Sequence, residues 1–246
     1  MQRRAFIAAA VIAAVVFAAV LALVIVLAPV VVLPVADAPP APTWGRPAEP
    51  PTPAATATRP GVAGGVDAQW LAATAERTGI PERALAAYAG VALAKATSMP
   101  ICGLSWNTLA AIGYAESRHG THAGSVIDVG GTVTPGIFGV ALAGGSTAHI
   151  PDSDGGTIDG DAEFDRAVGP MQLIPQTWRN WHIDASGDGV EDPQNIDDAT
   201  LATANYLCRA SGDMVSEAGW RAGVAAYNAA DSYLLAVAAA ADDYAG

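Results

Sequence analysis

The stretch SWNTLAAIGYAESRHG, residues 105–120, places one acidic side chain at the end of an apolar run. Ser105 is a candidate N-cap residue, Gly120 is a candidate stop signal, and apolar residues between them recur at helical spacing. The stretch therefore predicts a helix that packs in a core and ends beside a single carboxyl group, that of Glu116.

A carboxyl group in that position is partly removed from water. Desolvation disfavours the ionised form, so we expect the pKa of Glu116 to rise towards the working pH. A general acid that cleaves a glycosidic bond needs such a pKa. Taken alone, however, the residue fits a solvated glutamate near a helix end better, so the acid hypothesis depends on other segments.

The rest of residues 66–246 predicts a mainly α domain. Helical periodicity and end signals occur in five further segments, and a short Ala-rich helix is expected at the end of the chain. The five segments are residues 67–79, 81–99, 175–181, 197–212 and 216–231. The Gly-, Asp- and Thr-rich region 121–165 lacks this pattern, and we expect a small irregular or β insertion there, with a hairpin around residues 131–142.

The N-terminal part of the chain predicts a transmembrane helix. Arg3 and Arg4 precede an apolar run, of which residues 5–28 are 24 residues long, enough to span a bilayer core as a helix. The small-x-small site at residues 36–38 is followed at once by a proline, which is a poor context for cleavage. We therefore favour a retained signal anchor, residues 1–36, over a removed signal peptide. The basic flank predicts a single-pass protein of the cell membrane whose remaining chain lies on the cell-wall side.

Residues 37–65 form the second predicted region. They are rich in Pro, Ala, Thr and Gly and show no hydrophobic periodicity. This composition predicts a disordered, extended linker that separates the anchor from the folded domain.

The charge and cysteine content limit the functions of residues 66–246. This part carries 22 acidic and eight basic side chains, a formal balance of −14. It shows no Lys/Arg cluster for phosphates, so nucleic acid is not an expected partner. The two cysteines, Cys102 and Cys208, lie in the part expected to be exported, which favours a disulfide over two buried free thiols.

Four segments occur in an order that resembles the membrane-bound lytic transglycosylase B family of the lysozyme-like superfamily. They are ESRHG at 116–120, AVGPMQLIPQTW at 167–178, DASGDGVEDPQNIDDA at 184–199 and AAYNAA at 225–230. The resemblance covers about residues 66–245. It implies a lysozyme-like α fold that cleaves peptidoglycan between N-acetylmuramic acid and N-acetylglucosamine and leaves a 1,6-anhydromuramyl end.

The resemblance assigns the acid/base role to Glu116 alone. It also assigns five substrate-binding positions: Ser117, Met171, Gln172, Tyr227 and Asn228. Gln172 would bind substrate or position Glu116, and Met171 would pack against the pocket of the acid. Tyr227 would bond the acid or stack on a sugar, although helical periodicity alone favours a core position for this ring.

Glycosidases usually place two carboxylates around the bond that they cleave. A transglycosylase of this kind needs one and no cofactor for catalysis, because the muramyl 6-hydroxyl is the nucleophile. The sequence leaves a second carboxylate open, since Asp128 or Asp165 could fold nearby. Two alternatives therefore stay open: a lysozyme-type hydrolase that uses water, and a non-catalytic, calcium-stabilised wall-binding module.

Residues 184–195 resemble an EF-hand loop with a glycine, Gly189, at the sixth position. The twelfth position is Asn195 in place of the usual glutamate, and the family's longer variant of the loop closes on an aspartate. The expected ligand set is Asp184, Ser186, Asp188, Val190 through its carbonyl, and Asp198. Oxygen ligands favour a hard cation, so we expect a structural Ca²⁺; the alternative is an acidic turn without an ion.

A second acidic run, residues 152–165, also alternates Asp and Gly. Its spacing fits no calcium loop, so a solvated acidic loop at the rim of the cleft is the preferred interpretation. The four histidines do not cluster and suggest no zinc site, although His119 and Arg118 are candidates for substrate contact.

Overall fold

The computed structural model describes residues 41–246. The expected anchor, residues 1–36, lies outside this range. Within it, no helix is both long enough and apolar enough to cross a membrane.

The described residues are mainly helical, as expected. The helices are α2 (Ala68–Thr78), α3 (Glu82–Ser98), α4 (Trp106–Ser117), α5 (Pro175–Trp181), α6 (Ile196–Ser211), α7 (Glu217–Tyr227) and α8 (Asp231–Ala245). Three short 3-10 turns are η1 (Val62–Gly65), η2 (Pro100–Cys102) and η3 (His122–Gly124). Side-chain caps fix several helix starts: the Asp67 carboxylate accepts the backbone N–H groups of Gln69 and Trp70, and Ser216 caps α7.

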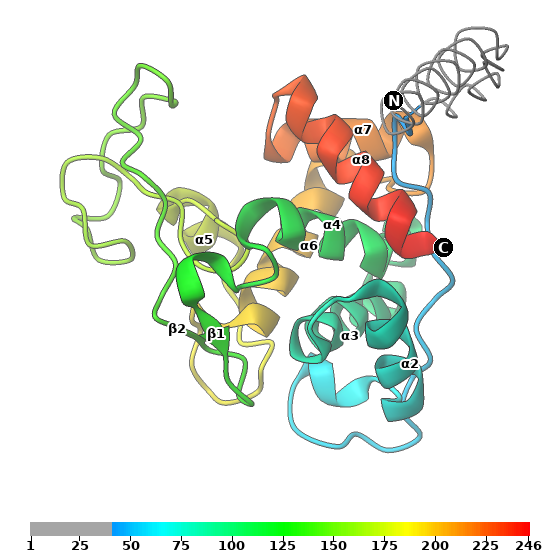
Figure 1. Ribbon diagram of the computed structural model, residues 1–246. Helices are drawn as coiled ribbons and strands as arrows, with labels where there is room; N and C mark the ends of the chain where they lie inside the picture. The colour runs from blue at the N-terminus through cyan, green and yellow to red at the C-terminus, as the bar shows by residue number, and fades with distance from the viewer. Residues whose placement is uncertain (1–40) are drawn as a thin grey trace, which may run out of the picture. The chain divides into compact units, whose positions relative to one another are not determined.

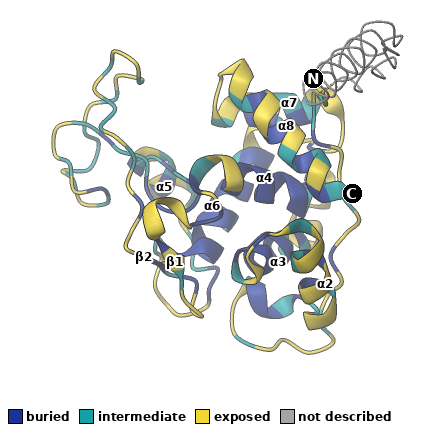
Figure 2. Ribbon diagram, in the orientation of Figure 1, coloured by how far each residue is buried: buried dark blue, intermediate teal, exposed yellow. Residues whose placement is uncertain are grey.

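Helix α4 lies at the centre of the fold and packs against α3, α6 and α8 (Figure 1). Its Trp106, Leu109 and Ile112 are buried, and Figure 2 shows buried residues along α4 and α6, whereas α2 and α8 keep exposed outer faces. The helix ends three residues earlier than the Gly120 signal predicts, because Arg118 already adopts a left-handed conformation, with φ 55°.

Residues 41–65 are not a disordered linker, and the expectation for this segment is wrong. Asn107 of α4 is fully buried, and its amide must find partners there. It donates to the carbonyl of Arg46 at 2.8 Å and accepts from the backbone N–H of Ala48 at 3.2 Å. We call residues 41–53 the N-terminal strap; Arg46 also pairs with Asp242 of α8 at 2.9 Å. The composition of this segment does not predict the strap, because the residues that hold it, Asn107 and Asp242, lie far along the chain.

The insertion contains little regular sheet. Strands β1 (Val126–Ile127) and β2 (Val133–Thr134) pair antiparallel, with Val126 opposite Thr134. The hairpin therefore begins before residues 131–142 and overlaps only the first part of that range. From Phe138 to Val168 the chain forms long loops that extend from the helices between β2 and α5 (Figure 1). Isolated bridges hold these loops together.

The cysteine expectation is confirmed. Cys102 of η2 and Cys208 of α6 are joined by a 2.04 Å S–S bond across 106 residues of sequence. The bond fastens the turn before α4 to the helix that follows the predicted calcium loop.

Candidate active site

Glu116 lies in the last turn of α4 and is only partly exposed. The hydroxyl of Tyr233, from the first turn of α8, donates a hydrogen bond to its Oε1 at 2.5 Å. Burial raises the pKa of Glu116 to about 7, while the bond from Tyr233 acts in the opposite direction. A large fraction of this carboxyl group is therefore protonated at neutral pH, as a general acid requires.

Ser117 is buried and holds the backbone around the acid. Its hydroxyl donates to the carbonyl of Pro170 at 2.6 Å and accepts from the backbone N–H of Gly120 at 2.7 Å. This side chain joins the end of α4 to the GPMQ segment, residues 169–172. The hydroxyl of Ser117 is thus occupied inside the fold, and the substrate contact expected of this residue stays a prediction.

The GPMQ segment forms a tight turn beside the acid. Gly169 has φ +76°, and a Cβ there would lie 1.8 Å from the carbonyl oxygen of Pro193, so only glycine fits. Met171 is fully buried in the core. Gln172 has φ 48°, and its amide donates to the carbonyl of Gly169 at 2.9 Å.

The junction of α7 and α8 faces this turn. Tyr227 donates to the carbonyl of Met171 at 2.5 Å, and its ring packs against that of Tyr206. Burial and the nearby charge of Glu116 raise the pKa of Tyr227 well above its usual value. Asn228 is exposed, and its side-chain oxygen accepts from the backbone N–H of Ala230 at 3.1 Å.

Two hollows share Asn228 as a lining residue. The first, the Gln172 groove, has a volume of about 580 Å³; it is lined by Gln172, Thr177, Tyr206, Tyr227 and Asn228, and by Leu142, Ser146, Thr147, Ala148 and Ile150 of the insertion. The second, the Arg118 hollow, has a volume of about 470 Å³ and is lined by Tyr114, Arg118, Asn228, Ser232 and Tyr233. Glu116 lines neither hollow itself, but it lies behind both: it bonds Tyr233 of the Arg118 hollow, and its charge acts on Tyr227 of the Gln172 groove.

Within the described part of the chain, no carboxylate lines either hollow, and Glu116 reaches them only through its contact with Tyr233. Asp165 is fully buried, and its two oxygens accept from the backbone N–H and the hydroxyl of Ser153. Asp128 accepts from the backbone N–H of Thr132 at 3.0 Å, in the β1–β2 turn. The arrangement leaves Glu116 as the acidic group of the site.

Two residues near Glu116 have positions that the sequence does not predict. Tyr233 has no helical or motif signal of its own, since it begins a helix expected only from its alanines. His119 is 5% exposed and lies between the hydroxyls of Tyr88, at 3.2 Å, and Tyr244, at 3.1 Å. Burial lowers its pKa to about 4, so His119 is a neutral link between helices rather than an accessible substrate contact.

The predicted calcium loop, residues 184–198, folds as a tight turn before α6. Asp184 accepts from the backbone N–H groups of Gly187 and Gly189, at 2.7 and 2.9 Å. Asp198 is fully buried, and its pKa is raised to about 6, mainly by burial and in part by the charge of Asp184. Its two oxygens accept from the backbone N–H groups of Ala185, Ser186 and Asp192, at 2.8, 2.9 and 3.0 Å, so the calcium site stays a prediction.

The other residues expected to bind Ca²⁺ do not point their oxygens to one common position. Ser186 donates to Asp184 at 3.2 Å, Asp188 accepts from the backbone N–H of Val190 at 2.8 Å, and Val190 is exposed. In the described range, one group of three acidic residues brings its carboxylate oxygens within 4.8 Å of one another. These residues belong to the second acidic run, 152–165, and they are Asp152, Asp154 and Asp165. Acidic loops adopt such a grouping without an ion as well.

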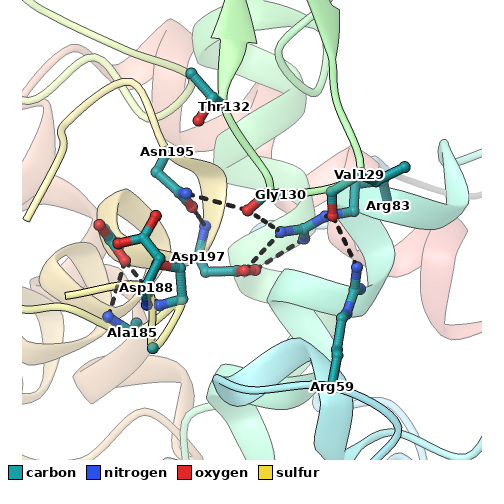
Figure 3. A network of polar contacts seen from close by, with 12 residues as sticks. Arg59, Arg83, Val129, Gly130, Thr132, Ala185, Asp188, Asn195 and Asp197 are labelled. Atoms are coloured by element: carbon teal, nitrogen blue, oxygen red, sulfur yellow. Dashed lines mark hydrogen bonds and ion pairs between the residues drawn. The ribbon is translucent and has the colours of Figure 1, made fainter. Parts of the chain in front are cut away.

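A polar network attaches the predicted calcium loop to the hairpin and to α3 (Figure 3). Arg83 of α3 makes two hydrogen bonds to Asp197, at 2.9 and 2.6 Å, and donates to the carbonyl of Gly130 at 3.1 Å. Arg59 donates to the carbonyl of Val129 at 3.0 Å, and Asn195 donates to that of Gly130 at 3.2 Å. The network fixes the start of α6, which carries Asp198.

Comparisons of the chain with models of protein families, with curated proteins and with solved structures gave no match.

Proposed function

We propose that the chain is a peptidoglycan lytic transglycosylase that cleaves the bond between N-acetylmuramic acid and N-acetylglucosamine. The observation that carries the proposal is a lone carboxyl group of raised pKa, Glu116, which bonds Tyr233 of the Arg118 hollow, while no described carboxylate lines either hollow. A hydrolase with two carboxylates would need a second acidic group facing the bond.

In the proposed reaction, Glu116 is the only proton carrier. Its protonated carboxyl group donates a proton to the bridging oxygen as the bond from that oxygen to C1 of the muramyl unit breaks. The resulting carboxylate then accepts the proton of the muramyl 6-hydroxyl, while the hydroxyl oxygen forms a bond to C1. One proton enters and one leaves the carboxyl group, so no water is consumed and the product carries a 1,6-anhydro ring.

The surrounding residues support this cycle through their contacts. Tyr233 donates a hydrogen bond to Oε1, which stabilises the carboxylate formed after the first proton transfer. The amides of Gln172 and Asn228 suit the acetamido and hydroxyl groups of a sugar chain. The rings of Tyr206 and Tyr227 add apolar surface to the groove. A Ca²⁺ ion held by Asp184 and Asp198 would supply only structural support to the start of α6.

The product separates this proposal from the two alternatives. Full-length protein would be incubated with purified peptidoglycan, and the released fragments identified by mass spectrometry. We expect fragments that are lighter by one water than reducing-end fragments. The substitution Glu116→Gln should abolish them, whereas Glu76→Gln, at an exposed site on α2, should not.

Reducing-end fragments alone would identify a lysozyme-type hydrolase. Unchanged release by the Glu116→Gln variant would show that this carboxyl group is not the acid. No release by the unmodified protein, together with retained binding to peptidoglycan, would support the wall-binding module. A membrane anchor in residues 1–36 remains part of the proposal, and it is tested by fractionation of cells that express the full chain.

A further inference from the structure

Arg118 is held in a defined position two residues after the acid. It has φ 55° and ψ 46° directly after α4, and its side chain is exposed. The guanidinium carbon lies 4.4 Å from the centre of the Tyr114 ring, and one of its N–H groups donates to the hydroxyl of Tyr114. Stacking of this kind orients the guanidinium plane and leaves its edge accessible.

The guanidinium group has donors to spare. Arginine carries five N–H donors, and the bond to Tyr114 uses one of them. Across residues 41–246, Arg118 makes no ion pair, whereas Arg46, Arg83 and Arg166 each pair with an aspartate. This domain has 22 acidic and eight basic side chains, so an arginine without an acidic partner is available for an anion from outside.

The charges of the two hollows differ. Arg118 is the one charged side chain that lines the Arg118 hollow, and the described lining of the Gln172 groove has none. Tyr233, which bonds Glu116, also lines the Arg118 hollow, so an anion bound there lies near the acid, between the end of α4 and the start of α8. A ligand with one carboxylate and otherwise neutral polar groups fits this asymmetry.

We propose that Arg118 binds a carboxylate of the muramyl unit in the Arg118 hollow and thereby sets the direction of the glycan across Glu116. This inference rests on the proposed function. In peptidoglycan the muramyl unit carries the carboxylate, on its lactyl group or on its stem peptide, whereas N-acetylglucosamine is neutral. A planar guanidinium group binds a carboxylate through two parallel N–H donors, which fixes orientation as well as affinity.

The test measures binding by full-length protein in the Glu116→Gln background, so that no ligand is cleaved. Three soluble glycan ligands would be compared by calorimetry. The first carries stem peptides, the second has free lactyl carboxylates, and the third has these carboxylates converted to neutral methylamides. The variants are Arg118→Gln, which keeps a non-glycine residue at the left-handed position, and Arg209→Gln, a control at an exposed arginine of α6.

We expect Arg118→Gln to weaken the binding of a carboxylate-bearing ligand about tenfold, as for the loss of a charge-assisted hydrogen bond. Weaker binding of the second ligand identifies the lactyl carboxylate, and weaker binding of the first ligand alone identifies the stem peptide. Binding of the methylamide ligand should not change, and Arg209→Gln should change none of the three affinities.

Equal affinities of the Arg118→Gln variant and its parent for all three ligands would overturn the inference and leave the proposed function intact. An equal loss of affinity for the methylamide ligand would also overturn the inference, because the substitution would then act through the shape of the hollow and not through the charge of Arg118. If the parent binds none of the ligands, the proposed function fails and the inference fails with it.

Discussion

The hydroxyl of Tyr233 is expected to control the pKa of Glu116, the proposed catalytic acid. It donates a 2.5 Å hydrogen bond to Glu116, whose pKa is about 7. A hydrogen bond to a charged group contributes about 1.5–3 kcal/mol, and about 1.4 kcal/mol corresponds to one pKa unit. Some of this energy does not contribute to the pKa shift, because the hydroxyl of Tyr233 also interacts with the protonated carboxyl group. Tyr233→Phe, which removes the hydroxyl and keeps the ring, should therefore raise the pKa of Glu116 by about one unit.

The shift can be measured with and without substrate. A general acid is active in its protonated form, so the descending limb of kcat/KM against pH should move to higher pH by about one unit. NMR titration of the ¹³C-labelled Glu116 carboxyl should give the same displacement in the free protein. Tyr206→Phe is the matched control, because its hydroxyl bonds the carbonyl of Ala226 and not the acid. An unchanged midpoint, or one at lower pH, would refute the role assigned to Tyr233.

Three other substitutions test the acid, the calcium loop and the strap. The pKa of Glu116 is 4.5 in the unfolded chain and about 7 in the folded protein, so stability is lost as the pH rises from 4.5 to 7, and this loss is complete above pH 7 and absent below pH 4.5. Glu116→Gln should therefore stabilise the protein by about 2–3 kcal/mol at pH 8 and by little at pH 4, measured by urea unfolding. Calcium at a hundred times its Kd should stabilise the unmodified protein by about 2.7 kcal/mol and raise its Tm, whereas Asp198→Asn should remove this response; an equal response of both proteins would contradict the site. Asn107→Ala, which breaks the bonds to the strap and to the carbonyl of Ala241, should cost about 2–4 kcal/mol and make residues 41–53 sensitive to protease, and an unchanged cleavage rate would contradict the strap.

The helices could be predicted from the sequence because their signals are local. The Asp67 cap and the left-handed Gly79 bound α2 within one or two residues of the expected limits. The disulfide followed from an even cysteine count in a segment expected to be exported. The burial that raises the pKa of Glu116 was also expected, since the apolar side chains of α4 precede it.

What could not be predicted depends on contacts between distant segments. The strap looks disordered in composition, and contacts with distant residues explain why it packs: the buried amide of Asn107, some 60 residues further along, and the carboxylate of Asp242. Tyr233 is 117 residues from the carboxyl group that it bonds. Ser117 follows the acid in sequence, but the helical turn directs it to Pro170 and away from the hollows.

The absence of acidic groups from the lining of the two hollows, in a domain with a formal balance of −14, has a kinetic consequence. An anionic polymer is repelled by the rest of the described surface at long range and attracted by Arg118 only at contact. The Debye length is about 8 Å at physiological ionic strength, so added salt weakens the repulsion more than the contact. The association rate of the protein with anionic wall polymer should therefore increase with ionic strength. Proteins that are steered to an oppositely charged partner behave in the opposite way, because salt slows their association.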